Sequence, residues 1–148
     1  MTLNELMIKY NFISKVLLRD GDKELGKDLK VKIMTMRIKM GKVKKEFDED
    51  LQEAVKGLTP EGYQELYVKK DKTKEEEAQL EKWNKQINDE YNSFIDQRGK
   101  EEVNLDTSIT EDEFLEILET NAGSDVEING QTIKAADFLE IFHSLFVE

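Results

Sequence analysis

Ten apolar residues spaced three or four positions apart run through residues 25–58 without an intervening proline. They are Leu25, Leu29, Ile33, Met36, Met40, Val43, Phe47, Leu51, Ala54 and Leu58. Residues at this spacing lie on one side of an α-helix. The pattern therefore predicts a helix over about residues 24–57, on the order of 45 Å long at 1.5 Å per residue. Such a long apolar face needs more than one partner along its length.

Three further helices are expected to supply that cover. Start signals predict one helix over about residues 2–19, a short helix over about 60–68 and a second long helix over about 74–98. The signals are the pairs Thr2 and Glu5, Thr59 and Pro60, and Thr73 and Glu76. We expect the two long helices to form an antiparallel hairpin, with the first helix as the third member of a helical arm over residues 1–99.

The last third of the chain contains an internal repeat. Residues 103–118 read VNLDTSITEDEFLEIL, and residues 126–142 read VEINGQTIKAADFLEIF with Gly130 inserted. Each copy predicts a strand, a turn and a helix, and the first strand is expected over Glu101–Asp106. Asn129 and Gly130 favour a type I′ hairpin turn, because both residues tolerate positive φ.

Two such copies are expected to pair their strands about a local pseudo-twofold axis and to lay both helices on one side. The predicted fold is therefore mainly α with a small β element. It consists of the helical arm and a duplicated strand–turn–helix module over residues 100–148.

Charge is distributed unevenly along the chain, whose net charge is −11. Residues 101–148 contain 13 acidic side chains and one basic side chain, Lys134, whereas residues 22–45 contain nine basic and three acidic ones. Opposite charges at two places in one chain favour head-to-tail association that weakens with salt. A homo-oligomer held by these two regions is one hypothesis.

Residue types that carry chemistry are sparse. The chain has no cysteine, and its one histidine, His143, stands between Phe142 and Ser144 without a nucleophile motif nearby. Asp20–Glu24 resembles the start of a calcium loop, but Leu25 and Val31 occupy the sixth and twelfth positions, which need glycine and an acid. We therefore expect no enzymatic activity, no cofactor and no metal.

The sequence also carries no signal-peptide pattern and no apolar run near the roughly 20 residues of a membrane span. We accordingly expect the protein to be neither secreted nor bound to a membrane. The lysines of the long basic helix alternate with apolar residues and have no aromatic side chains between them. Nucleic acid is therefore not the expected partner, although phosphate contacts by this helix remain a third hypothesis.

The layout resembles a family of small helical proteins from tailed bacteriophages and prophages. The resemblance lies in the Lys-rich amphipathic segment Leu29–Leu51, the acidic segment Glu75–Arg98, and Val103–Leu118. It implies a role in the virion, in its assembly or in host takeover, and hence a place in the virion or the host cytoplasm. The family brings no catalytic residues.

We thus predict a non-enzymatic phage protein that acts through protein–protein contacts, as a virion or assembly component or an accessory factor. The alternative is an inhibitor of a host enzyme or anti-phage defence protein that docks through the acidic module. The partner, a phage structural or host protein, is expected to meet an apolar helix face, provided that this face is not fully buried, together with nearby acids. These residues are Phe138, Leu139, Phe142, Leu145 and Phe146, with Glu111, Asp112 and Glu116.

Overall fold

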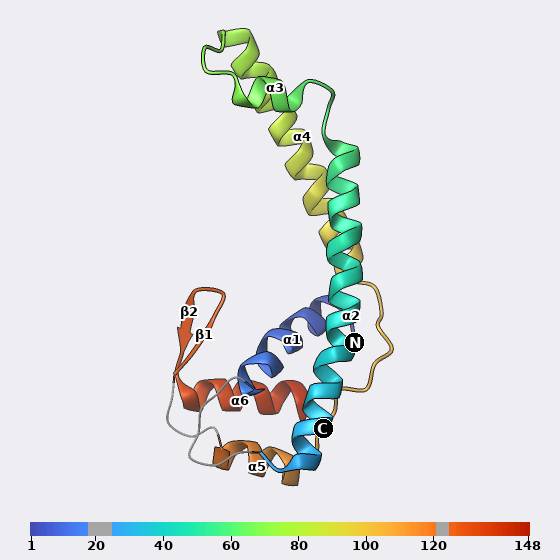
Figure 1. The fold of residues 1–148 in the computed structure, drawn as a ribbon, viewed down its shortest axis with the longest axis vertical. Helices are drawn as coiled ribbons and strands as arrows, with labels where there is room; N and C mark the ends of the chain where they lie inside the picture. The colour runs from blue at the N-terminus through green and yellow to red at the C-terminus, as the bar shows by residue number, and fades with distance from the viewer. Residues whose placement is uncertain (18–24, 121–124) are drawn as a thin grey trace. The chain divides into compact units, whose positions relative to one another are not determined.

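The computed structural model describes residues 1–17, 25–120 and 125–148, which are mainly α-helical with one two-stranded antiparallel sheet (Figure 1). The elements are α1 (Leu3–Leu17), α2 (Lys27–Leu58), α3 (Tyr63–Val68), α4 (Lys74–Gly99), α5 (Glu111–Thr120), β1 (Val126–Ile128), β2 (Gln131–Ile133) and α6 (Ala135–Phe146). This confirms the predicted fold class. The start of the calcium-loop pattern, Asp20–Glu24, lies outside the described residues. The same holds for Asp20–Asp22 and Asn121–Gly123, where the sequence also indicates helix ends.

Three helices start with capping boxes, and two of these starts, at Thr2 and Thr73, are predicted ones. Thr2 and Glu5, Thr110 and Glu113, and Thr73 and Glu76 each exchange side-chain and backbone hydrogen bonds. The cap predicted at Thr59 is wrong. Its hydroxyl donates to the Val55 carbonyl, and α3 begins only at Tyr63 after a turn that places Gly62 at φ 84°. The N–H of Tyr63 donates a hydrogen bond to the carbonyl of Pro60 and closes this turn.

The described chain forms two compact units, residues 1–44 with 102–148 and residues 45–101. This division differs from the boundary at residues 99 and 100 that the sequence indicates. The difference arises because the C-terminal segment shares its core with α1 and with residues 27–44 of α2. Among the residues described, no helix is long and apolar enough to cross a membrane.

A row of aromatic rings forms the centre of the first unit. Phe12 of α1 stacks on Phe138 of α6, with ring centroids 5.2 Å apart and ring planes 8° apart. Phe142 lies 6.2 Å from Phe138 and 4.5 Å from Phe146. Phe114 of α5 lies 6.4 Å from Phe142, so α1, α5 and α6 share one aromatic core.

The other side of α1 packs on α2 (Figure 1). The Nε of Arg37 donates to the Ser14 hydroxyl at 3.1 Å, and the Tyr10 ring would lie 3.5 Å from a Cβ placed on Gly41. A Cβ there would be in ordinary van der Waals contact with the ring, so Tyr10 lies against α2 at Gly41. As a result, α1 lies between α2 and α6 within this unit, and is not a third member of the helical hairpin.

The two copies of the repeat have different structures. In the second copy, β1 and β2 form the predicted hairpin, with φ of 51° at Asn129 and 77° at Gly130. The first-copy strand predicted over Glu101–Asp106 is wrong, because only Glu102 makes an isolated bridge, to Thr2. The predicted pseudo-twofold pairing of the two copies is therefore wrong as well.

The inserted glycine explains the difference. Gly130 allows a tight turn in the second copy, whereas in the first copy the carboxylate of Asp106 accepts hydrogen bonds from the N–H and hydroxyl of Ser108. These bonds fold the chain locally instead of continuing an extended strand. The N–H of Val103 donates a hydrogen bond to the carbonyl of Met1, so the start of the first copy pairs with the N-terminus of the chain.

The second unit is a helical hairpin made by residues 45–58 of α2, by α3 and by α4, with the two longer helices antiparallel (Figure 1). The Phe47 and Phe94 rings stack with centroids 6.3 Å apart, and Nη2 of Arg98 lies 2.9 Å from Oδ2 of Asp50. Of residues 45–101, all of which the structure describes, only Phe47 and Gly99 are buried. The core of this unit is correspondingly thin.

Candidate protein-docking site

The apolar face of α6 that the sequence predicts as a partner surface is the core of the first unit. Phe138 and Phe142 have no exposed surface, and Phe146 is 2% exposed. Leu139 is buried and Leu145 is half-buried. The three phenylalanines are therefore buried in the core and are not accessible to a partner.

The three acidic residues predicted beside this face lie in different environments. Oε1 of Glu111 lies 2.8 Å from Nε2 of His143, and Oε1 of Glu116 accepts a hydrogen bond from the Gly26 N–H at 2.6 Å. Asp112 is exposed. Glu116 thus fixes the entry into α2, whereas Glu111 helps to fix the edge of a groove.

That groove lies between α5 and α6 and has a volume of about 570 Å³. Its apolar lining comes from Phe114, Leu118, Ala135, Ala136 and Leu139, and its polar lining from Glu140 and His143. Leu139 and the His143 partner Glu111 are the predicted site residues that belong to this region. The other lining residues were not predicted as a site.

The small side chains at the start of α6 leave space beside α5. Ala135 and Ala136 line one wall, while Leu118, with 40% of its surface exposed, lines the other. His143 is held edge-on against the Phe114 ring at 4.8 Å and by its contact with Glu111. The groove is therefore built on the aromatic core.

Charge around the groove is predominantly negative. Glu140 lies in its lining, and the described part of the segment after residue 101 has Lys134 as its only basic side chain apart from His143. Leu115, one turn before Leu118 on α5, extends the apolar surface outward. This combination suits an apolar side chain flanked by cations.

The sequence of α5 carries a signal for the groove. Helical periodicity alone, however, does not distinguish apolar residues of a groove from apolar residues of the core. Phe114 and Ile117 are buried, and Leu115 and Leu118 add apolar positions outside that buried stripe. Extra apolar residues beyond the core stripe of a short helix are the expected mark of a second contact surface.

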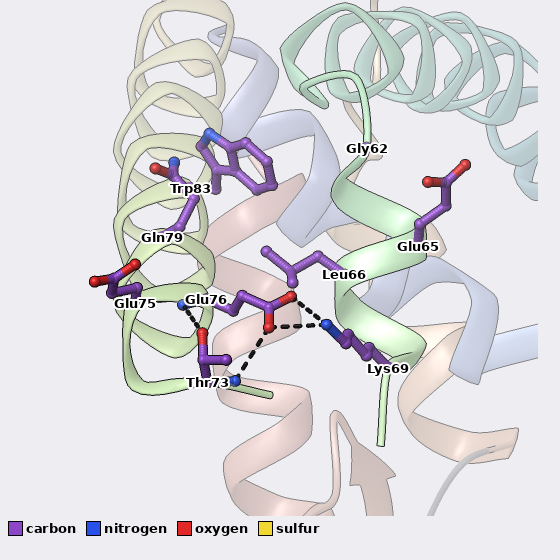
Figure 2. A pocket seen from close by; sticks show the side chains of 9 residues that line it. All are labelled: Gly62, Glu65, Leu66, Lys69, Thr73, Glu75, Glu76, Gln79 and Trp83. Atoms are coloured by element: carbon purple, nitrogen blue, oxygen red, sulfur yellow. Dashed lines mark hydrogen bonds and ion pairs between the residues drawn. The ribbon is translucent and has the colours of Figure 1, made fainter. Parts of the chain in front are cut away.

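A second hollow, of about 480 Å³, lies between α3 and α4 in the other unit (Figure 2). Both carboxylate oxygens of Glu76 accept from the Nζ of Lys69, at 2.8 and 2.7 Å, and one also accepts from the N–H of Thr73. The bonds from Lys69 and then Thr73 hold the pKa of Glu76 below its usual value. These polar groups are paired with one another and stabilise the start of α4. They are therefore less available to a ligand, and the hollow is a weaker candidate for a binding site than the α5–α6 groove.

Within residues 1–17, 25–120 and 125–148, no three histidine or acidic side chains gather closely enough to hold a metal ion. In comparisons with known proteins, no family model, curated protein or solved structure matches the chain. The chemistry of the α5–α6 groove is therefore the main indication of function.

Proposed function

We propose that this chain is a non-enzymatic protein that binds another protein in the α5–α6 groove, as a virion or assembly component of a tailed bacteriophage or as an accessory factor. The observation that carries the proposal is an apolar groove with a negative border on a rigid aromatic core. The resemblance to phage proteins supports the biological setting.

The groove chemistry defines the partner. Leu118 and Ala136 offer apolar contact, and Glu140 offers a carboxylate beside it. A protein segment with one or more protruding aliphatic side chains and adjacent lysine or arginine residues satisfies both features. Apolar contact would supply most of the affinity, and the charges would set orientation and the rate of encounter.

Site-specific crosslinking in bacterial cells tests this proposal. A photoreactive amino acid at Ala136, which is exposed in the groove, is expected to capture a defined protein, whereas the same group at Asn129 in the exposed hairpin turn should not. Adding Leu118→Lys should abolish the product by placing a cation among apolar side chains. Equal labelling at Ala136 and Asn129, or a product that survives Leu118→Lys, would contradict docking in the groove.

A second candidate function is inhibition of a host enzyme or defence protein. The observation favouring it is the acidic balance of residues 101–148, which contain 13 acidic side chains. The identity of the crosslinked protein separates the two functions. A virion component should be crosslinked to a phage structural protein and be found in purified particles by mass spectrometry. An inhibitor should be crosslinked to a single host protein and be missing from particles.

A further inference from the structure

We propose that the segment which fills the α5–α6 groove belongs to a second copy of this chain and is an exposed apolar stripe on its α2. This inference rests on the proposed function, since it names the occupant of the same groove. It predicts a head-to-tail assembly in which each copy contributes its groove to one neighbour and its stripe to another.

The stripe consists of Val31, Met34 and Ile38. These residues are 56%, 40% and 54% exposed, and their spacing places them on one side of α2. The buried side of the same helix includes Ile33 and Met40, which are fully enclosed. The outward side of α2 therefore carries apolar residues that the first unit does not use in its own core.

Basic side chains border this stripe. Lys27, Lys30 and Lys42 are exposed and lie within one or two turns of its members along α2. Single exposed apolar residues are ordinary on protein surfaces, but three in register on one helix face mark a contact surface. With its lysines, this surface has the chemistry that the groove requires of a partner.

The stripe and the groove match in length. From Val31 to Ile38 the stripe extends about 10 Å along α2, at 1.5 Å per residue. From Ala135 to His143 the α6 wall of the groove extends about 12 Å by the same measure. All three apolar side chains of the stripe can therefore meet the groove at once.

The charges of the two surfaces match as well. The lysines beside the stripe would face Glu140 in the groove and the carboxylate of Glu111 at its edge. A symmetric contact of stripe with stripe would instead oppose lysines, and one of groove with groove would oppose acids. Like charges opposed across an interface disfavour it, so the contact is heterologous.

Within one copy the two surfaces do not cover each other. Ile38 on α2 and Leu118 in the groove both remain exposed. A heterologous contact whose rotation does not close adds copies one after another, so the assembly should grow with protein concentration. It should also weaken with salt, because exposed charges are screened over about 10 Å at 0.1 M ionic strength.

Sedimentation velocity of the purified protein over a concentration series, in about 20 mM and about 0.5 M salt, tests the assembly. The average mass should at least double with concentration at low salt and fall toward one chain at high salt. Ile38→Glu and Leu118→Lys should each remain a single chain under low-salt conditions. Val68→Glu, which places the same charge at an exposed apolar position on α3, is the matched control and should associate like the wild type.

Mixing the two variants gives the decisive result. The Leu118→Lys chain keeps a working stripe, and the Ile38→Glu chain keeps a working groove. An equimolar mixture should therefore form complexes of two chains and no larger species. Far-UV circular dichroism should show the wild-type helix content for each variant, as expected for substitutions at exposed positions.

A second pair of variants exchanges charges between the stripe and the groove and leaves the apolar residues unchanged. Lys30→Glu and Glu140→Lys should each reduce association, and the chain that carries both changes should recover it, because the opposed charges are again of opposite sign. A wild-type protein that remains one chain at every concentration in low salt would overturn self-assembly. So would Ile38→Glu or Leu118→Lys associating as the wild type does.

The crosslinking experiment separates failure of this inference from failure of the proposed function. A product between Ala136 and a different protein, with a monomeric wild type in solution, would leave the groove as a docking site and reject the second copy as its occupant. The absence of any product at Ala136, in cells and with the purified protein, would reject both. A product linking Ala136 of one copy to α2 of another supports both.

Discussion

Nζ of Lys32 on α2 lies 2.7 Å from Oε1 of Glu113 on α5. The same carboxylate oxygen accepts a hydrogen bond from the N–H of Thr110, at 2.9 Å, and so completes the capping box of α5. One side chain therefore both starts a helix and attaches it to α2. Partial burial raises the pKa of Glu113, but the bonds from Lys32 and Thr110 outweigh it and hold the pKa below its usual value.

Glu113→Gln should remove a pH-dependent part of the stability of the first unit. Because the pKa of Glu113 is lower in the folded state, its charge stabilises the fold above the unfolded-state pKa, about 4.3, and this contribution is lost as pH falls through the folded pKa. The variant should lose about 1 kcal/mol at neutral pH, the usual size of a cap or an ion pair, and the difference from wild type should vanish at acid pH, below the folded-state pKa of Glu113.

Urea unfolding followed by circular dichroism at both pH values measures the difference. In a double-mutant cycle with Lys32→Met, the effect of Glu113→Gln should shrink, because the cation that favours the carboxylate is then missing. An effect of Glu113→Gln that is equal at both pH values would contradict the ionic role.

Phe138→Ala should destabilise the first unit by about 3–5 kcal/mol, the usual cost of removing a buried phenylalanine ring. Phe138 is fully buried and stacks on Phe12 with ring centroids 5.2 Å apart, so the truncation leaves a cavity at the junction of α1 and α6. Thermal and urea unfolding should show the loss. Leu115→Ala, at a position that is half exposed, should change stability by about 0.5 kcal/mol or less. Equal effects of the two substitutions would place Phe138 on a surface instead.

Thr73→Ala should destabilise the second unit by about 1 kcal/mol, because it removes the side-chain acceptor of the capping box at the start of α4. The single tryptophan of the chain, Trp83, lies on α4 and makes fluorescence a probe of this unit. Thr59→Ala is the control, since the exposed hydroxyl of Thr59 bonds only to a carbonyl in its own helix turn, that of Val55. The midpoint of the Trp83 transition should move for Thr73→Ala and stay nearly constant for Thr59→Ala.

Gly130→Ala should weaken the β1–β2 hairpin by about 1 kcal/mol through backbone strain alone. Gly130 has φ of 77°, and no atom lies within 4 Å of the position that a Cβ would take, so no steric clash with a neighbour contributes. Amide hydrogen exchange across the Val126–Ile133 pair should accelerate. Asn129→Gly, at the preceding position with φ of 51°, relieves the same kind of strain and should leave exchange unchanged or slower.

The local features of this protein could be predicted because neighbouring residues determine them. The capping boxes at Thr2 and Thr73 satisfy backbone groups within four residues, and the Asn129–Gly130 turn depends on two φ angles. Periodicity likewise located α2 and α4, since apolar residues three and four apart share a helix face whatever covers that face.

Prediction failed where the partner of a segment decides its conformation. The alternation of Val103 and Leu105 matches a strand, yet the segment pairs with Met1, and the hydrogen bonds from Ser108 to Asp106 turn the chain. The repeat in the sequence therefore does not become a repeat in the structure. Only its helices, α5 and α6, form in both copies.

The sequence by itself determined the helices, their capping boxes, the hairpin turn and the separation of basic from acidic residues, because each follows from contacts or counts within a short stretch of chain. The tertiary structure alone decided that Phe138 is core, that α1 joins the C-terminal segment and that a groove opens beside Leu118. The pattern of an amphipathic helix shows that its apolar face will be buried. Which segment packs on that face depends on side chains far away in the sequence. The stacking of Phe12 on Phe138, 126 positions apart in the sequence, is the contact that decides which face of α6 is buried and which face stays exposed.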